Sequence, residues 1–128
     1  MLELALLSPW IIFLFIGVLD FGFYAYSLIT LETATRTAAM NNANAGTPND
    51  SATACTIVLN EFSSMVNMNG VSACGTGTPV TVSASQVTGP DNASAAQVSV
   101  TYTTPTLIPI PGLLQGQYTI TRTVTMKL

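Results

Sequence analysis

Side chains that could act as acids, bases, nucleophiles or metal ligands are few in this chain and widely spaced. Its 128 residues include no histidine, three lysine or arginine residues and six aspartate or glutamate residues. Histidine is the commonest general base and metal ligand, and without it a serine nucleophile would need a lysine base. The only lysine is Lys127, and no phosphate-binding loop or paired metal-ligand motif is present. We therefore predict that the protein is not an enzyme and has no catalytic, cofactor-binding or metal site.

The two cysteines, Cys55 and Cys74, both follow the long apolar run at the start of the sequence. Two thiols are too few to form a zinc site from one chain. They predict a disulfide formed in an oxidising compartment, and the alternative is a pair of buried free thiols. Closing a loop of about 20 residues would stabilise the fold by ~3 kcal/mol in the chain-entropy description.

Two carboxylates, Glu3 and Asp20, lie in or beside an apolar segment, where a charge is costly and is usually paired or functional. Glu3 could pair with the amino group of its own chain or of a neighbour, or it could simply lie at the membrane edge. Asp20 has no basic residue three or four positions away. Its partner could be Tyr24, a polar group on another subunit, or a proton that keeps the carboxyl neutral.

Charge is scarce throughout the chain. Charged residues make up 7% of it, against about 25% in an ordinary soluble domain, and Thr, Ser, Asn and Gly take their place. The three cations are Arg36, Arg122 and Lys127, which form no cluster. Nucleic-acid binding needs a cluster that neutralises phosphates, so we predict no nucleic-acid partner.

The chemistry-bearing residues are positioned by one long helix, which we expect from Leu4 to about Ala43. Between Leu4 and Ile29 only Asp20 carries a charge, and about 20 apolar residues suffice to cross a bilayer. The pattern does not resemble a cleaved signal peptide, because it lacks a basic start and a small-residue cleavage site. A helix of about 40 residues would be roughly 60 Å long, twice the thickness of the hydrocarbon layer.

Several residues of this helix are unusual for their positions. Pro9 lies inside the apolar run and predicts a kink, or a regular helix that begins only at Ser8–Pro9. Small residues, Gly17 and Gly22 among them, would let helices approach closely in apolar surroundings; simple tolerance of glycine is the alternative. Glu32 and Arg36 are spaced for a weak surface ion pair.

A shorter second helix should follow the turn-rich segment 41–50. Asp50 or Ser51 can cap its start, and Asn69–Gly70 is a reasonable end. Its apolar face at helical spacing should comprise Ala54, Ile57, Val58, Phe62, Met65 and Val66. Cys55 would lie on this helix and Cys74 in the loop after it.

The remainder predicts an antiparallel sheet of about three strands, near 80–84, 97–103 and 117–128, with a turn at 89–92. The last strand alternates most clearly, with Tyr118, Ile120, Val124, Met126 and Leu128 on one face and threonines on the other. Arg122 falls on the apolar face. It could reach the rim of the sheet or pair with Glu61 or Glu32, and the sequence does not choose between these.

The connector at 105–116 contains three prolines, which exclude a central strand, and large aliphatic side chains, which are unusual in a solvated loop. Either it folds back on the core or it presents an apolar patch to another subunit. The residues of this possible contact loop are Leu107, Ile108, Ile110, Leu113 and Leu114.

Taken together, the N-terminal motifs resemble the TadE-like pseudopilin family of Tad-type, type IV pilus-related systems. The shared features are Glu3-Leu-Ala-Leu-Leu-Ser-Pro9, a run of large aliphatics, Asp20-Phe-Gly, and a helix that continues with Ala, Thr and Arg. The resemblance implies an α+β, pilin-like fold. Residues 1–43 would be an assembly helix that spans the membrane before assembly, and residues 44–128 an extracytoplasmic head.

The resemblance also implies partners and a location. These are the bacterial inner membrane before assembly, a prepilin peptidase, the pilus assembly machinery and, in a helical homopolymer at the cell surface, identical subunits. Glu3 would neutralise the N-terminal amine of a subunit, and Pro9, Gly17, Asp20 and Gly22 would contribute to helix packing. We therefore expect a structural pilin. The alternatives are a minor TadE-like pseudopilin of a Tad-type apparatus and a membrane-anchored binding module.

Overall fold

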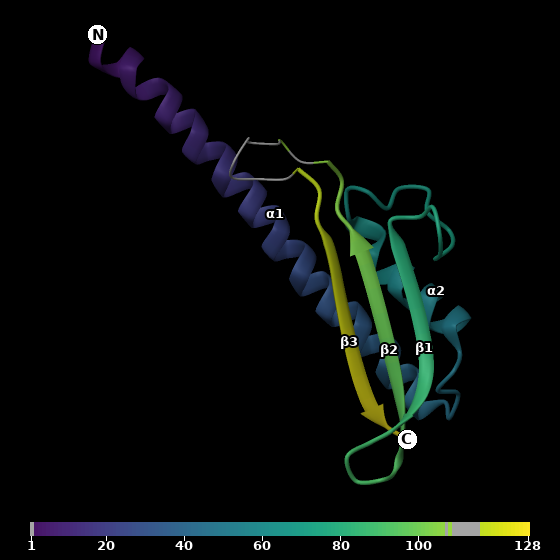
Figure 1. Ribbon diagram of the computed structural model, residues 1–128. Coiled ribbons are helices and arrows are strands. Elements are labelled where there is room, and N and C mark those ends of the chain that lie inside the picture. The colour runs from purple at the N-terminus through teal and green to yellow at the C-terminus, as the bar shows by residue number, and fades with distance from the viewer. Residues whose placement is uncertain (1, 107, 109–115) are drawn as a thin grey trace.

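A computed structural model describes residues 2–106, 108 and 116–128 (Figure 1). Its elements are α1 (Leu2–Asn44), α2 (Ser51–Glu61), the 3-10 helix η1 (Phe62–Ser64), β1 (Val80–Thr88), β2 (Ser94–Thr103) and β3 (Thr119–Lys127). The strands form one antiparallel sheet in the order β1-β2-β3. The predicted α+β layout of a long helix, a short helix and three strands is confirmed.

The long helix α1 runs without interruption for 43 residues and includes Pro9. The expectation that regular helix begins only at Ser8–Pro9 is therefore wrong. Proline has no N–H to bond the carbonyl four residues back, so one backbone bond to Ala5 is absent. Ala5, Leu6 and Leu7 are strong helix formers, and the helix continues past this gap.

The two halves of α1 have different surroundings, and Figure 1 shows the N-terminal half extending beyond the rest of the molecule. From Ala5 to Phe15 every side chain is exposed. From Leu31 onward one face is fully buried, with Leu31, Ala34, Ala38 and Ala39 at 0% exposure. The alanines allow close approach of α1 to the other elements, because their side chains end at Cβ.

The turn between the two helices is closed by polar side chains. The Nδ2 of Asn42 donates to the Asp50 carbonyl at 3.0 Å. Asp50 is the N-cap of α2, where one carboxylate oxygen accepts from the backbone N–H groups of Ala52 and Thr53 at 3.1 and 3.0 Å. The other oxygen accepts from the Thr53 hydroxyl at 2.6 Å. This hydroxyl bond, with the backbone bonds, lowers the pKa of Asp50 below 3.8.

The second helix ends earlier than the sequence pattern predicts. It stops at Glu61, and the chain continues in three-residue turns, with Met65 N–H bonding to the Phe62 carbonyl and Met68 N–H to the Met65 carbonyl. A turn of three residues, instead of the 3.6 of an α-helix, brings Phe62, Met65 and Met68 into the core at 0, 3 and 4% exposure. Val66, predicted on the buried face, is 74% exposed, so that assignment is wrong.

The sheet packs one face against the helices and leaves the other to solvent. The central strand β2 buries Val98, Val100 and Tyr102 completely. The ring of Tyr102 meets the ring of Phe62 edge-on at 5.4 Å, and burial raises the pKa of the Tyr102 phenol. Helix α1 contacts β2 and β3, and α2 contacts β1.

The solvent face of the sheet is a ladder of hydroxyl side chains. The hydroxyls of Ser99 and Thr123 bond at 2.9 Å, as do those of Thr101 and Thr121. Each pair lies directly opposite across β2 and β3, where cross-strand side chains interact best. The face predicted to be exposed to solvent is therefore polar, and its hydroxyl groups bond to one another across β2 and β3.

Candidate assembly surface

The N-terminal half of α1 is an uncovered apolar surface. Leu6, Trp10, Val18 and Phe21 are 76, 68, 69 and 73% exposed. By length and composition, the helix is able to cross a membrane. Monomeric soluble proteins rarely expose apolar patches of this extent, so this surface needs lipid or protein around it.

Gly17 and Gly22 lie in a shallow groove on this surface. The groove is lined by Phe13, Leu14, Gly17, Val18, Phe21 and Gly22. A Cβ added at either glycine would meet no atom within 4 Å. Packing among the described residues therefore does not require these glycines. Their predicted role in helix contacts between subunits stays a prediction.

Asp20 is enclosed although it belongs to an otherwise exposed stretch. It is 8% exposed, and its Oδ2 has no hydrogen-bond partner among the described residues. The predicted partner Tyr24 instead packs its ring edge-on against Tyr118 at 5.7 Å. A buried carboxylate oxygen without a partner is costly, which distinguishes Asp20 from the residues around it.

The other predicted assembly residues occupy different positions. Glu3 is exposed in the first turn of α1, where a carboxylate is favoured by the helix dipole. Ile108 of the possible contact loop is 55% exposed. Leu107, Ile110, Leu113 and Leu114 lie outside the described residues, so the role of that loop stays a prediction.

Cys55 of α2 and Cys74 form a disulfide across a sequence separation of 19. The bond joins α2 to the segment that leads into β1. The Gly75 N–H bonds to the Val80 carbonyl at 3.0 Å, so the disulfide is followed at once by contact with the first strand. It therefore fixes the position of α2 relative to the sheet.

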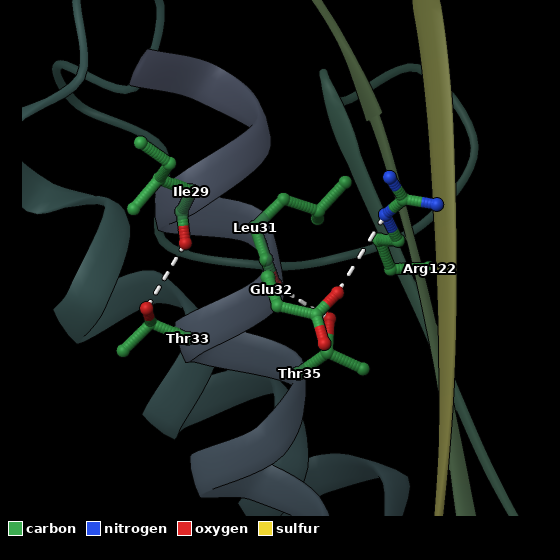
Figure 2. A network of polar contacts seen from close by, with 6 residues as sticks. All are labelled: Ile29, Leu31, Glu32, Thr33, Thr35 and Arg122. Atoms are coloured by element: carbon green, nitrogen blue, oxygen red, sulfur yellow. Dashed lines mark hydrogen bonds and ion pairs between the residues drawn. The ribbon is translucent and has the colours of Figure 1, made fainter. Parts of the chain in front are cut away.

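Arg122 pairs with Glu32, one of the two partners that the sequence left open. Its Nε lies 3.6 Å from Oε2 of Glu32, as Figure 2 shows across the space between β3 and α1. Both side chains are about half exposed, so the pair is worth at most about 1 kcal/mol. The predicted Glu32–Arg36 pair is not formed, because the Glu32 carboxylate points toward the sheet.

Two structural roles were missed by reasoning from the sequence. Ser51 and Asn49 use their side-chain oxygens to accept from the Ala84 and Gln86 N–H groups of β1, at 3.0 and 2.7 Å. These bonds occupy the outer edge of β1, a position where unpaired amides invite another strand. Local sequence indicates only a helix cap here, because the partner strand is more than 30 residues away.

The hydroxyls along α1 were also missed. Ser27, Thr30, Thr33, Thr35 and Thr37 each donate to the carbonyl four residues earlier, at 2.7 to 3.0 Å. Figure 2 shows two of them, from Thr33 to Ile29 and from Thr35 to Leu31. A hydroxyl bonded in this way needs no water, so this stretch tolerates burial against an apolar partner.

An uncovered apolar helix attached to a small disulfide-linked α/β head is the layout of a pilin-like protein. Residues 1–40 match the family described as TadE-like protein. The N-terminal segment of the chain is therefore similar to that of TadE-like pseudopilins of Tad-type pili, and the resemblance seen in the sequence is confirmed. Comparisons with curated proteins and with solved structures give no significant match.

Proposed function

We propose that the protein is a structural subunit of an extracellular pilus that polymerises through α1. The observation that carries this proposal is the division of α1 into an uncovered apolar half and a half that packs under the head. The apolar half lies in the inner membrane before assembly. In the filament it is covered by the α1 helices of identical subunits.

The rest of the molecule supports packing among many copies. Charged residues are few, so little charge must be desolvated when subunits meet. The hydroxyls of α1 and of the outer sheet face are bonded within the chain, so burying them leaves few polar groups unsatisfied. A prepilin peptidase and the pilus assembly machinery are the partners that this route requires.

The family description favours a second version of the same role. The TadE-like match suggests a Tad pilus-associated pseudopilin. A minor pseudopilin would join or prime a filament built mainly of another pilin. This family is structural rather than enzymatic. Both versions use α1 in the same way and differ in copy number.

Electron microscopy and quantitative mass spectrometry of sheared surface material test the proposal. A major subunit predicts thin filaments in which this chain dominates; trace amounts in filaments of another pilin would support the minor role. If the chain stays monomeric and remains in detergent-extracted membranes, with no filaments at the surface, the proposal is wrong. Glu3→Ala should leave membrane insertion intact while lowering filament yield, and a normal yield would remove Glu3 from assembly.

A further inference from the structure

The dipeptide Asn69–Gly70 carries a chemistry that the pilus function does not use. An asparagine loses its side-chain amide when the backbone nitrogen of the next residue attacks its side-chain carbonyl carbon. Glycine favours this attack, because it has no Cβ to hinder the approach. The sequence contains eight asparagines, and Asn69 is the only one that a glycine follows.

The nitrogen of Gly70 is free to make this attack. A backbone N–H that donates a hydrogen bond must first release it, which costs free energy. Among the described residues, the Gly70 N–H has no hydrogen-bond partner. Gly70 lies in the left-handed region at φ +81°, and a Cβ built on it would meet no atom within 4 Å. Both Asn69 and Gly70 are exposed, so water reaches the pair.

The other seven asparagines precede N–H groups that are already bonded. The residues after Asn41, Asn42 and Asn60 lie within helices, where each N–H bonds to the carbonyl four residues back. The other four such N–H groups donate to nearby oxygens: Ala45 to Asn41 at 2.9 Å, Asp50 to Thr47 at 3.1 Å, Met68 to Met65 at 3.1 Å and Ala93 to Oδ1 of Asp91 at 3.2 Å. The fold therefore leaves a free nitrogen only after Asn69.

The turn that carries the pair belongs to no helix or strand. It is closed by one backbone bond, from the Val71 N–H to the Met68 carbonyl at 3.1 Å. The side chain of Asn67 is tied to the Thr103 carbonyl at 3.2 Å, whereas the amide of Asn69 has no partner among the described residues. Exposed segments with few bonds open locally at low cost in free energy, so the Asn69 side chain can turn toward the Gly70 nitrogen.

We infer that Asn69 is a site of spontaneous deamidation. The Gly70 nitrogen bonds to Cγ of Asn69, the bond from Cγ to Nδ2 breaks, and ammonia leaves with the proton of the Gly70 N–H. The product is a five-membered succinimide ring. Water then opens the ring at either carbonyl carbon and gives aspartate or isoaspartate. Water is the only co-reactant, and the inference does not depend on the proposed pilus function.

The two products differ in their effect on the head. Aspartate only adds one negative charge to a chain of formal net charge −3. Isoaspartate also lengthens the main chain by one carbon, between two residues that the core holds. Met68 is 4% exposed, and Val71 packs against the core cluster. Three residues beyond Val71, the disulfide fixes Cys74. The isoaspartate form should therefore be less stable than the aspartate form.

Incubation of the full chain in detergent, in a mildly alkaline buffer, tests the site by peptide mapping with tandem mass spectrometry. Asn69 should be the first asparagine to convert. The internal control is exposed Asn60, which should convert at least roughly fivefold more slowly, the factor that one net hydrogen bond imposes on a rate. The variant Asn69→Gln should give no acidic form at this position on the same timescale, because its longer side chain closes a larger ring more slowly. Conversion of Asn60 before Asn69, or conversion of Asn69 only after denaturation, would overturn the inference.

The variant Asn69→Asp separates the added charge from the altered backbone. An isoaspartyl methyltransferase, which labels isoaspartate and not aspartate, should label the incubated wild type and not the freshly purified variant. The isoaspartate form should melt at least about 4 °C below Asn69→Asp, the shift expected for one net hydrogen bond in a domain of this size. Aspartate without isoaspartate in the incubated wild type would overturn the succinimide route. Equal melting temperatures would overturn the conclusion that the core and the disulfide restrain this turn.

Discussion

Replacing both cysteines, as Cys55→Ser/Cys74→Ser, should destabilise the head without unfolding α1. The bond closes a loop with a sequence separation of 19. In the chain-entropy description, opening a loop of about 20 residues costs about 3 kcal/mol of stability. The loop contains Phe62, Met65 and Met68, all buried, so the unfolded chain gains freedom in a segment that the fold must order.

The expected loss is large for a head of this size. For domains of 60–100 residues, a change of 1 kcal/mol shifts Tm by roughly 4–8 °C. The double variant should therefore melt about 12–24 °C lower than the oxidised protein. The full chain in detergent should be followed by near-ultraviolet circular dichroism of buried Tyr102. Fluorescence of Trp10 is unsuitable, because Trp10 lies in the uncovered half of α1.

Reduction and alkylation of the wild-type protein is the matched control and should reproduce the same decrease. A decrease of less than about 4 °C in both samples would refute the reasoning. It would mean that the loop between Cys55 and Cys74 is already restricted in the unfolded state. A decrease in the serine variant alone would instead assign the loss to the new hydroxyls.

Three further outcomes follow from the described contacts. Phe62→Ala should lower the free energy of unfolding by about 3–5 kcal/mol, because Phe62 is fully buried against Tyr102. Val66→Ala, at a position that is 74% exposed, should change it by less than about 0.5 kcal/mol. Chemical denaturation of both variants tests whether the chain leaves the α-helical repeat at the end of α2. The pKa of Asp50 in the folded protein lies below its usual value of 3.8. The contribution of this carboxylate to stability is therefore present above pH 3.8 and is lost as the pH falls through the folded-state pKa. Asp50→Asn, which still caps the helix, should lose less stability between about pH 5 and 2 than the wild type, and equal acid sensitivity would contradict the assignment. Gly22→Leu should leave the detergent-solubilised monomer folded, since a Cβ there meets nothing within 4 Å. If helices of neighbouring subunits approach at the groove, the same variant should lower filament yield. Unchanged filaments in electron micrographs would exclude that approach.

Much of the architecture could be predicted from local patterns. An apolar run without a helix stop predicts α1, and the residues of β2 and β3 alternate in burial as their polarity alternates. Such signals depend on neighbours a few positions away, which the sequence displays directly. The strand ends were less well placed, because β1 continues to Thr88 through pairing with β2. That pairing supplies backbone bonds that the strand propensity of Gln86 does not indicate.

Local sequence patterns are enough to predict an apolar helix too long for a membrane span alone, two cysteines able to pair, and a sheet with one face exposed to solvent. Each conclusion follows from composition or from a period of two or 3.6 residues. The packed fold is needed to show that Arg122 pairs with Glu32, that Glu32 therefore does not pair with Arg36, and that Ser51 and Asn49 occupy the edge of β1. These facts depend on distances between elements far apart in the chain, and packing sets those distances.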